Sequence, residues 1–255
     1  AVIEAIQQGI KVEEVDALFS KPMGIPKTGV FGLIDLVGLD LMPLIGKSLR
    51  DNLPSEDTYC HLEQDTPVIK KMIEEGYTGR KGKGGFYRVN RDTGEKIKEV
   101  IDLKTGIYSK SDKIKLSALE NTHTLKDLLS YPDQYGKYTW SVLSQLLSYV
   151  ASHASEIAND IVGIDTAMKL GYGWKYGPFE LFDKIGTEWV VKKLKEEGKP
   201  VPSLLEKIGS NSFYKVQNGK LHYFSFAGDY LEVQRLPGQL LLSDIKISSQ
   251  PLAEN

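Results

Sequence analysis

The chain contains one twelve-residue stretch twice. Residues 27–38 read KTGVFGLIDLVG and residues 175–186 read KYGPFELFDKIG, and the two share a Lys, two Gly, a Phe, a Leu and an Asp at matching positions. Upstream, the segment around Asp16 faces the segment around Asp165. Two copies at this spacing are too few and too far apart for a solenoid or a propeller. The duplication therefore predicts two related units joined by a linker.

Bulk composition sets few further limits. A chain of 255 residues can bury one large core or two moderate ones, and a net charge of -2 gives no global signal for nucleic acid. The lone Cys60 cannot form an intrachain disulfide, and the sequence has neither a signal-peptide pattern nor an apolar run long enough to span a membrane. We therefore expect a cytoplasmic protein without a membrane span.

Helical periodicity dominates both copies, so the chain is predicted to be mainly α. The first copy predicts helices over 1–9, 12–20, 31–50 and 67–75, with Pro43 kinking or splitting the third. The second copy predicts helices over 138–160, 164–170, 178–197 and 202–208, and a short helix over 125–129 precedes it. The same order of helices in both copies agrees with the duplication.

A small β-hairpin is expected at the end of each copy. In the first, strands at 86–89 and 96–101 flank a turn at 92–94. In the second, strands at 213–216 and 221–226 flank Asn218-Gly219, a dipeptide typical of tight hairpin turns. Each helical unit is therefore predicted to carry a β appendage.

Domain boundaries follow from this order of elements. We expect a first helical domain at 1–117, a linker at 118–137, a second and degenerate copy at 138–235, and a linker at 236–255 that leads toward a missing C-terminal region. The first ten residues are amphipathic from the start, with no initiating Met and no N-cap residue. The sequence is thus expected to be an excised fragment whose first domain is truncated.

Residues that could carry chemistry are few. The Gly- and Lys-rich run at 79–85 suggests either a phosphate cradle or a structural loop, and the absence of the Gly-Lys-Ser/Thr order favours the loop. No Gly-x-Gly-x-x-Gly stretch joins a strand to a helix, so no Rossmann unit is expected. The four histidines lack metal-ligand spacing, and no nucleophile elbow occurs. We therefore predict no catalytic, cofactor-binding or metal-binding residue.

Two repeated carboxylates allow more than one interpretation. Asp35 and Asp183 occupy equivalent positions, and a repeated acid can be catalytic or structural; duplication of a fold favours the structural role. Tyr172, Trp174 and Tyr176 could line a pocket or pack the units, and packing is the simpler interpretation.

These motifs together resemble the C-terminal helical domain of 3-hydroxyacyl-CoA dehydrogenases. The resemblance rests on the Val/Ile-Asp pair that ends at Asp16 and at Asp165, and on the Gly-bearing loop that follows it. It also rests on the Gly-x-Phe-x-Leu-x-Asp-x-x-Gly pattern and on the run Gly79-x-Lys81-x-x-x-Gly85-Phe86-Tyr87. It implies two related units of the kind found in the C-terminal part of 6-phosphogluconate dehydrogenase, each with a β-hairpin appendage. The tandem arrangement is similar to the multifunctional enzymes of fatty-acid β-oxidation.

The resemblance also implies an activity for the full-length protein. Such enzymes oxidise a 3-hydroxyacyl-CoA to a 3-oxoacyl-CoA with NAD, which an N-terminal Rossmann domain binds. That domain, with its catalytic His-Glu pair, does not lie in this chain, so the isolated chain is expected to be inactive and to bind no cofactor. Some multifunctional members carry a fused enoyl-CoA hydratase domain, which is a further expected partner.

Lys27, Gly29 and Phe31 are the expected contacts for the acyl-CoA substrate. The second copy has lost most of the Gly-Lys-Gly-Phe-Tyr pattern and is expected to be structural. Simple members of the family pair two helical domains across a dimer interface, and two copies in one chain could satisfy that surface, which predicts a monomer. The alternative is a non-catalytic helical scaffold that keeps the duplicated fold for protein association.

Overall fold

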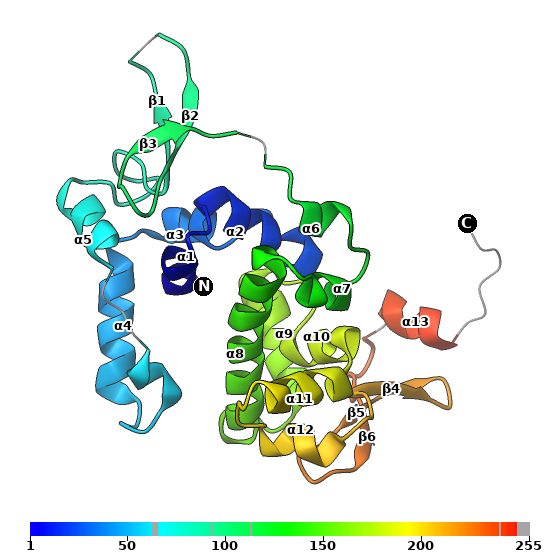
Figure 1. Ribbon diagram of the computed structural model, residues 1–255. Coiled ribbons are helices and arrows are strands. Elements are labelled where there is room, and N and C mark those ends of the chain that lie inside the picture. Colours follow the sequence, from blue (N-terminus) through cyan, green and yellow to red (C-terminus); the bar gives the residue numbers. More distant parts are fainter. Residues whose placement is uncertain (63–65, 93, 113, 240, 249–255) are drawn as a thin grey trace. The chain divides into compact units, whose positions relative to one another are not determined.

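The computed structural model describes residues 1–62, 66–92, 94–112, 114–239 and 241–248 (Figure 1). The fold is mainly α, with two three-stranded antiparallel sheets among the described residues, which confirms the predicted class. The chain forms two compact units, Ala1–Val142 and Leu143–Asn255. The domain boundaries expected from the sequence stay a prediction.

The first unit contains eight α-helices or parts of helices, two 3-10 helices and one sheet among its described residues. They are α1 (Val2–Gln8), α2 (Val12–Leu18), η1 (Lys21–Met23), α3 (Phe31–Val37), α4 (Leu41–Asn52), η2 (Thr58–His61), α5 (Pro67–Glu74), β1 (Tyr87–Asn90), β2 (Ile97–Ile101), β3 (Tyr108–Lys110), α6 (Ser117–Glu120), α7 (Leu125–Ser130) and the start of α8 (Gln134–Ile157).

The second unit begins within α8 and repeats the order of helices followed by a sheet. Its further elements are α9 (Ile161–Tyr172), α10 (Pro178–Ile185), α11 (Thr187–Glu196), α12 (Ser203–Ile208), β4 (Tyr214–Gln217), β5 (Lys220–Phe224), β6 (Tyr230–Glu232) and α13 (Leu242–Ser248). The helix α8 spans 24 residues. No helix in the described part of the chain combines the length and the apolarity that crossing a membrane requires.

The long helix predicted in each copy is in fact two helices, and the break lies at a glycine. Gly38 separates α3 from α4 with φ 120°, and Gly186 separates α10 from α11 with φ 94°. These left-handed values favour a residue without a Cβ atom. The prediction that Pro43 breaks the helix was wrong, because Pro43 lies in the first turn of α4, where a backbone N–H has no intrahelical acceptor.

Both predicted hairpins are confirmed, and each is extended by a strand that the sequence did not reveal. Strand β1 pairs with β2 and strand β4 with β5, all antiparallel. Asn218 and Gly219 adopt φ 51° and 71°, as a type I′ hairpin turn requires. The additional strands β3 and β6 are three residues long and lie at the sheet edges. Strands this short leave no periodic pattern to detect.

The two units repeat the same internal packing. Helix α2 contacts α3 and β2, and its counterpart α9 contacts α10 and β5. The rings of Phe31 and Phe86 meet edge to face at 4.6 Å and 69°, and those of Phe179 and Phe213 at 4.8 Å and 67°. All four rings are fully buried. Each unit therefore fastens its sheet to its helices through the same aromatic pair.

The segment at 236–255, expected to be a linker, contains the helix α13, which packs against β5. Asp244 of this helix accepts hydrogen bonds from Nε and Nη2 of Arg235, both at 2.8 Å. A bidentate pair of this kind fixes orientation as well as distance. The remainder of the expected linker, 249–255, lies outside the described residues.

Candidate functional site

The repeated motifs converge on buried carboxylates, the first of which is Asp16 on α2. Its oxygens accept hydrogen bonds from the N–H groups of Phe31 at 2.7 Å and Gly32 at 3.1 Å, and from the hydroxyl of Tyr87 at 2.9 Å. The first N–H groups of a helix have no intrahelical acceptor. Asp16 satisfies two of them at the start of α3 from another helix.

This contact requires a glycine at the turn that leads into α3. A Cβ atom on Gly29 would lie 2.5 Å from the Asp16 carboxyl carbon, and Gly29 also adopts φ +64°. No larger residue fits without moving α2. The Gly in the repeated motif therefore sets the distance between the two helices.

A second carboxylate, Asp35 at the end of α3, ties this helix to the sheet. It accepts hydrogen bonds from the N–H groups of Phe86 at 2.8 Å and Tyr87 at 2.9 Å. Tyr87 thus contacts Asp35 through its backbone and Asp16 through its hydroxyl. One tyrosine therefore joins α2, α3 and β1.

The second unit contains the same network with equivalent residues. Asp165 accepts hydrogen bonds from the N–H groups of Phe179 at 2.9 Å and Glu180 at 3.1 Å, and from the hydroxyl of Tyr214 at 3.0 Å. Asp183 accepts from the N–H groups of Phe213 at 2.6 Å and Tyr214 at 2.8 Å. The duplication has therefore preserved a three-dimensional arrangement as well as a sequence motif.

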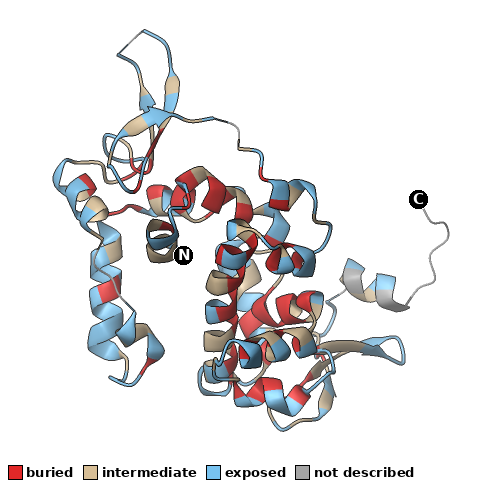
Figure 2. Ribbon diagram, viewed as in Figure 1, coloured by how far each residue is buried: buried red, intermediate tan, exposed pale blue. Residues whose placement is uncertain are grey.

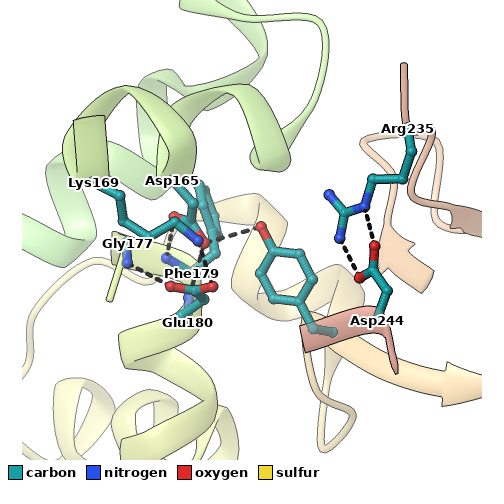
Figure 3. Close-up of polar contacts among 8 residues, drawn as sticks. Asp165, Lys169, Gly177, Phe179, Glu180, Arg235 and Asp244 are labelled. Carbon is teal, nitrogen blue, oxygen red and sulfur yellow. Dashed lines mark hydrogen bonds and ion pairs between the residues drawn. The ribbon is translucent and has the colours of Figure 1, made fainter. Parts of the chain in front are cut away.

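An ion pair is added to the network of the second unit (Figure 3). Lys169 donates to Glu180 at 2.7 Å, and Glu180 also accepts a hydrogen bond from the N–H of Gly177 at 2.8 Å. A Cβ atom on Gly177 would lie 2.3 Å from the Cβ atom of Asp165, the same constraint that Gly29 meets. The first copy has Gly32 at the position of Glu180 and lacks this pair.

Burial and hydrogen bonding shift the pKa values of the network carboxylates in opposite directions. Burial raises the pKa of Asp16 and of Asp183 to about 6 and that of Asp165 to about 7, although the N–H and O–H donors favour the charged form. Burial and the adjacent Asp165 raise the pKa of Tyr214, so its hydroxyl stays protonated and donates. Each tyrosine thus acts as a fixed donor.

The geometry supports the structural interpretation of the repeated acids. Asp16 and Asp165 each accept three hydrogen bonds, and Asp35 and Asp183 each accept two, from the first residue of a strand and from the residue before it. A general base needs a lone pair that can reach a substrate proton. These oxygens face backbone N–H groups and a tyrosine hydroxyl of their own unit. Sequence reasoning identified the repetition of Asp16 and Asp165 but assigned them no role.

The three expected substrate contacts lie around this network. Lys27 is exposed, and Gly29 is buried against Asp16. Phe31 is fully buried, with its ring against Phe86. Phe31 and Gly29 therefore hold the loop in place, while Lys27 is the residue whose side chain solvent can reach. Their part in substrate binding stays a prediction.

The Gly- and Lys-rich run at 79–85 uses its backbone donors internally. The N–H of Gly79 bonds the carbonyl of Gly84 at 2.8 Å, and the N–H of Arg80 bonds the carbonyl of Asp35 at 2.8 Å. The N–H groups of Gly82, Lys83 and Gly85 also have carbonyl acceptors. A phosphate cradle needs several of these donors to point at the anion. The loop is therefore built for packing against α3.

Comparison with known proteins identifies the family to which the chain is related. The profile of the 3-hydroxyacyl-CoA dehydrogenase, C-terminal domain, matches residues 1–89 and again residues 136–223. The chain is 38% identical, over 92% of its length, to a protein of Rickettsia prowazekii named as a fatty acid oxidation complex trifunctional enzyme. It is 31% identical, over its whole length, to a protein of Bacillus subtilis named as a 3-hydroxyacyl-CoA dehydrogenase.

These relatives are much longer than the chain, which spans 32% of the first and 33% of the second. The profile matches cover both units and include the carboxylates, the glycine turns and the tyrosines of both networks. The chain therefore belongs to the 3-hydroxyacyl-CoA dehydrogenase family and contains the C-terminal domain of that family twice.

Proposed function

We propose that this chain is the helical, substrate-side portion of an NAD-dependent 3-hydroxyacyl-CoA dehydrogenase of fatty-acid β-oxidation. The observation that carries the proposal is the double match to the C-terminal domain of that family. In the full-length enzyme a nucleotide domain would bind NAD and supply the chemistry of hydride transfer. The residues of this chain would hold the acyl-CoA and support the nucleotide domain.

Within this portion we assign the acyl-CoA contact to the loop at Lys27, Gly29 and Phe31. The ammonium of Lys27 is exposed and can meet an anionic group of the ligand. Asp16 fixes the loop through the N–H of Phe31 and through close contact with Gly29. Because these contacts fix the loop backbone, binding through Lys27 orders only the lysine side chain.

An activity assay of the isolated chain tests whether hydride transfer requires the nucleotide domain. Purified chain with acetoacetyl-CoA and NADH should oxidise no more NADH than buffer alone, because no described residue forms a Rossmann nucleotide site. The assay follows NADH absorbance. Turnover above the buffer control would contradict the proposal.

Binding separates the enzyme portion from a purely structural scaffold. Titration of the chain with a long-chain acyl-CoA should show binding that Lys27→Gln weakens about threefold. The matched control is Lys21→Gln, which removes an exposed lysine from the same loop segment. Equal loss in both variants, or no binding by the unaltered chain, would favour the scaffold.

Assembly and location are further parts of the proposal. We infer a cytoplasmic enzyme whose full-length form includes the nucleotide domain and a fused enoyl-CoA hydratase domain. Two helical copies on one chain would satisfy each other's association surface, so the isolated chain should sediment as a monomer at micromolar concentration. A tight dimer would contradict this part.

A further inference from the structure

Two lysines of the second unit lie near the phenol ring of Tyr176: Lys175 is in the loop between α9 and α10, and Lys184 is on α10. The Nζ atom of Lys184 lies 3.9 Å from the centre of the Tyr176 ring, and that of Lys175 lies 5.1 Å from it. Hydrogen bonds from Lys175 and then Lys184, with the charges of both, lower the pKa of the Tyr176 phenol. Two exposed lysines therefore meet the half-buried Tyr176.

No acid of the described residues forms an ion pair with either lysine. The carboxylate of Glu180, on the first turn of α10, already pairs with Lys169 and accepts the N–H of Gly177. Two neighbouring ammonium groups repel each other, and an anion between them would replace this repulsion by two charge-assisted hydrogen bonds. The two lysines therefore leave a local excess of positive charge beside Tyr176.

The first copy of the domain lacks this arrangement. At the positions of Tyr176 and Lys184 it has Thr28 and Leu36, and only Lys27 matches Lys175. Packing of the shared fold therefore does not require the second lysine or the phenol. Their presence in the second copy needs another reason.

Two aromatic residues that shortly precede Lys175 in the chain narrow the chemistry of the ligand. Tyr172 ends α9 with 64% of its surface exposed, and the half-buried Trp174 lies between it and Lys175 in the loop. Aromatic side chains beside lysines are the usual means of holding a base and its phosphate, because the base stacks on a ring. A bare inorganic anion would gain nothing from these rings.

We propose that Lys175, Tyr176 and Lys184 bind the phosphate group of a phosphorylated nucleotide, whose base stacks on the neighbouring aromatic side chains. The site belongs to the second copy, whereas the substrate loop was assigned to the first. It does not depend on the proposed function. Coenzyme A and free nucleotides share the required chemistry.

Calorimetric titration of the whole chain with coenzyme A, ADP and sodium phosphate tests the site. Both nucleotides should bind more tightly than phosphate, and Lys175→Gln with Lys184→Gln should weaken their binding about tenfold. Tyr176→Phe should weaken it less, because both ammonium groups remain. The relative affinity of coenzyme A and ADP identifies which source of the nucleotide the site prefers.

The matched control removes the same charge elsewhere in the unit, through Lys192→Gln with Lys195→Gln on α11, where both positions are exposed. This pair should leave nucleotide affinity within about twofold. Equal weakening by both pairs, phosphate binding as tight as nucleotide binding, or no binding at millimolar concentration would overturn the proposal. So would coenzyme A binding that only Lys27→Gln abolishes, since this result would place the ligand in the first copy and leave the proposed function intact.

Discussion

The two copies of the domain agree in their interior and differ on their outer face. Asp16, Asp35 and Tyr87 in the first unit form the same contacts as Asp165, Asp183 and Tyr214 in the second. A buried carboxylate with several donors leaves little freedom, because losing one partner exposes unsatisfied groups. The shared network therefore consists of contacts that this fold requires in order to form.

The helices after the network show the difference (Figure 2). Figure 2 shows α4 mostly exposed. On α3, Leu33 and Val37 are 39% and 38% exposed, whereas their counterparts on α10, Leu181 and Ile185, are 0% and 2% exposed. Four further exposed apolar residues of the first copy replace charged residues of the second. They are Leu36, Leu44, Ile45 and Leu49, opposite Lys184, Lys192, Lys193 and Glu197. The outer face is thus where the copies have diverged.

Removal of a network carboxylate should have the largest effect. Asp165→Ala leaves two buried N–H groups and the hydroxyl of Tyr214 without their acceptor and should lower the free energy of unfolding by about 3 kcal/mol. Asp16→Ala should cost the first unit a similar amount. Urea unfolding of both variants measures this. A loss below about 1 kcal/mol in only one variant would show that the two networks are not equivalent.

A methyl group at the glycine turn should cost less. Gly177→Ala places a Cβ atom 2.3 Å from Asp165 and should destabilise the second unit by about 2 kcal/mol, because α9 and α10 must separate. Gly171→Ala on α9 is the control, since nothing lies within 4 Å of its Cβ position. Thermal unfolding should show this control unchanged or slightly stabilised. Equal destabilisation of both variants would exclude the close approach as the cause.

The pH dependence should distinguish the copies more finely. Burial places the pKa of Asp16 near 6 and that of Asp165 near 7 in the folded state, both above the unfolded value of 3.8. The folded state therefore binds protons that the unfolded state releases, so the stability each acid contributes falls as pH rises from about 4 to its folded pKa.

Urea unfolding between pH 4 and pH 8 should show this decrease, which is about 3 kcal/mol for Asp16 and about 4 kcal/mol for Asp165. It should end about one pH unit higher for the second unit. Asp165→Asn should remove its share of the slope. A stability that rises with pH across this window would mean that the backbone donors outweigh burial.

The outer face should give the smallest change in stability. Leu44→Lys with Ile45→Lys installs the residues of the second copy on α4, and both positions are exposed at 64% and 47%. The free energy of unfolding should change by less than about 0.5 kcal/mol, while binding of an apolar dye should fall. A matched exchange at Leu170, 82% exposed on α9, should change dye binding less, because it removes one exposed apolar side chain and not two adjacent ones. A large loss of stability would show that α4 is packed.

Much of the fold could be predicted from local sequence signals. The helix ending at Gly9, the Pro-started helix α5 and the Asn218-Gly219 turn follow rules that involve only neighbouring residues. The break at Gly38 could not be separated from a break at Pro43, since both residues interrupt helices. Which one does so depends on where the next helix starts.

Only part of the candidate site could be predicted from the sequence. Repetition marked Asp35, Asp183 and the glycine turns, and it also marked Asp16 and Asp165 without giving them a partner. The partner of Asp35 is the backbone of Phe86 and Tyr87, about fifty residues away along the chain. Every residue other than proline has a backbone N–H group, so the residue types in the sequence do not indicate which of these groups forms such a contact.

The sequence alone therefore determined the duplication, the helical class, the hairpins and the family resemblance, because periodicity, turn chemistry and repeated motifs are local properties. Only the tertiary structure decided that the repeated acids fasten helices to sheets, that β3 and β6 complete the sheets, and that two lysines meet at Tyr176. Each of these depends on distances between segments, and chain packing sets those distances.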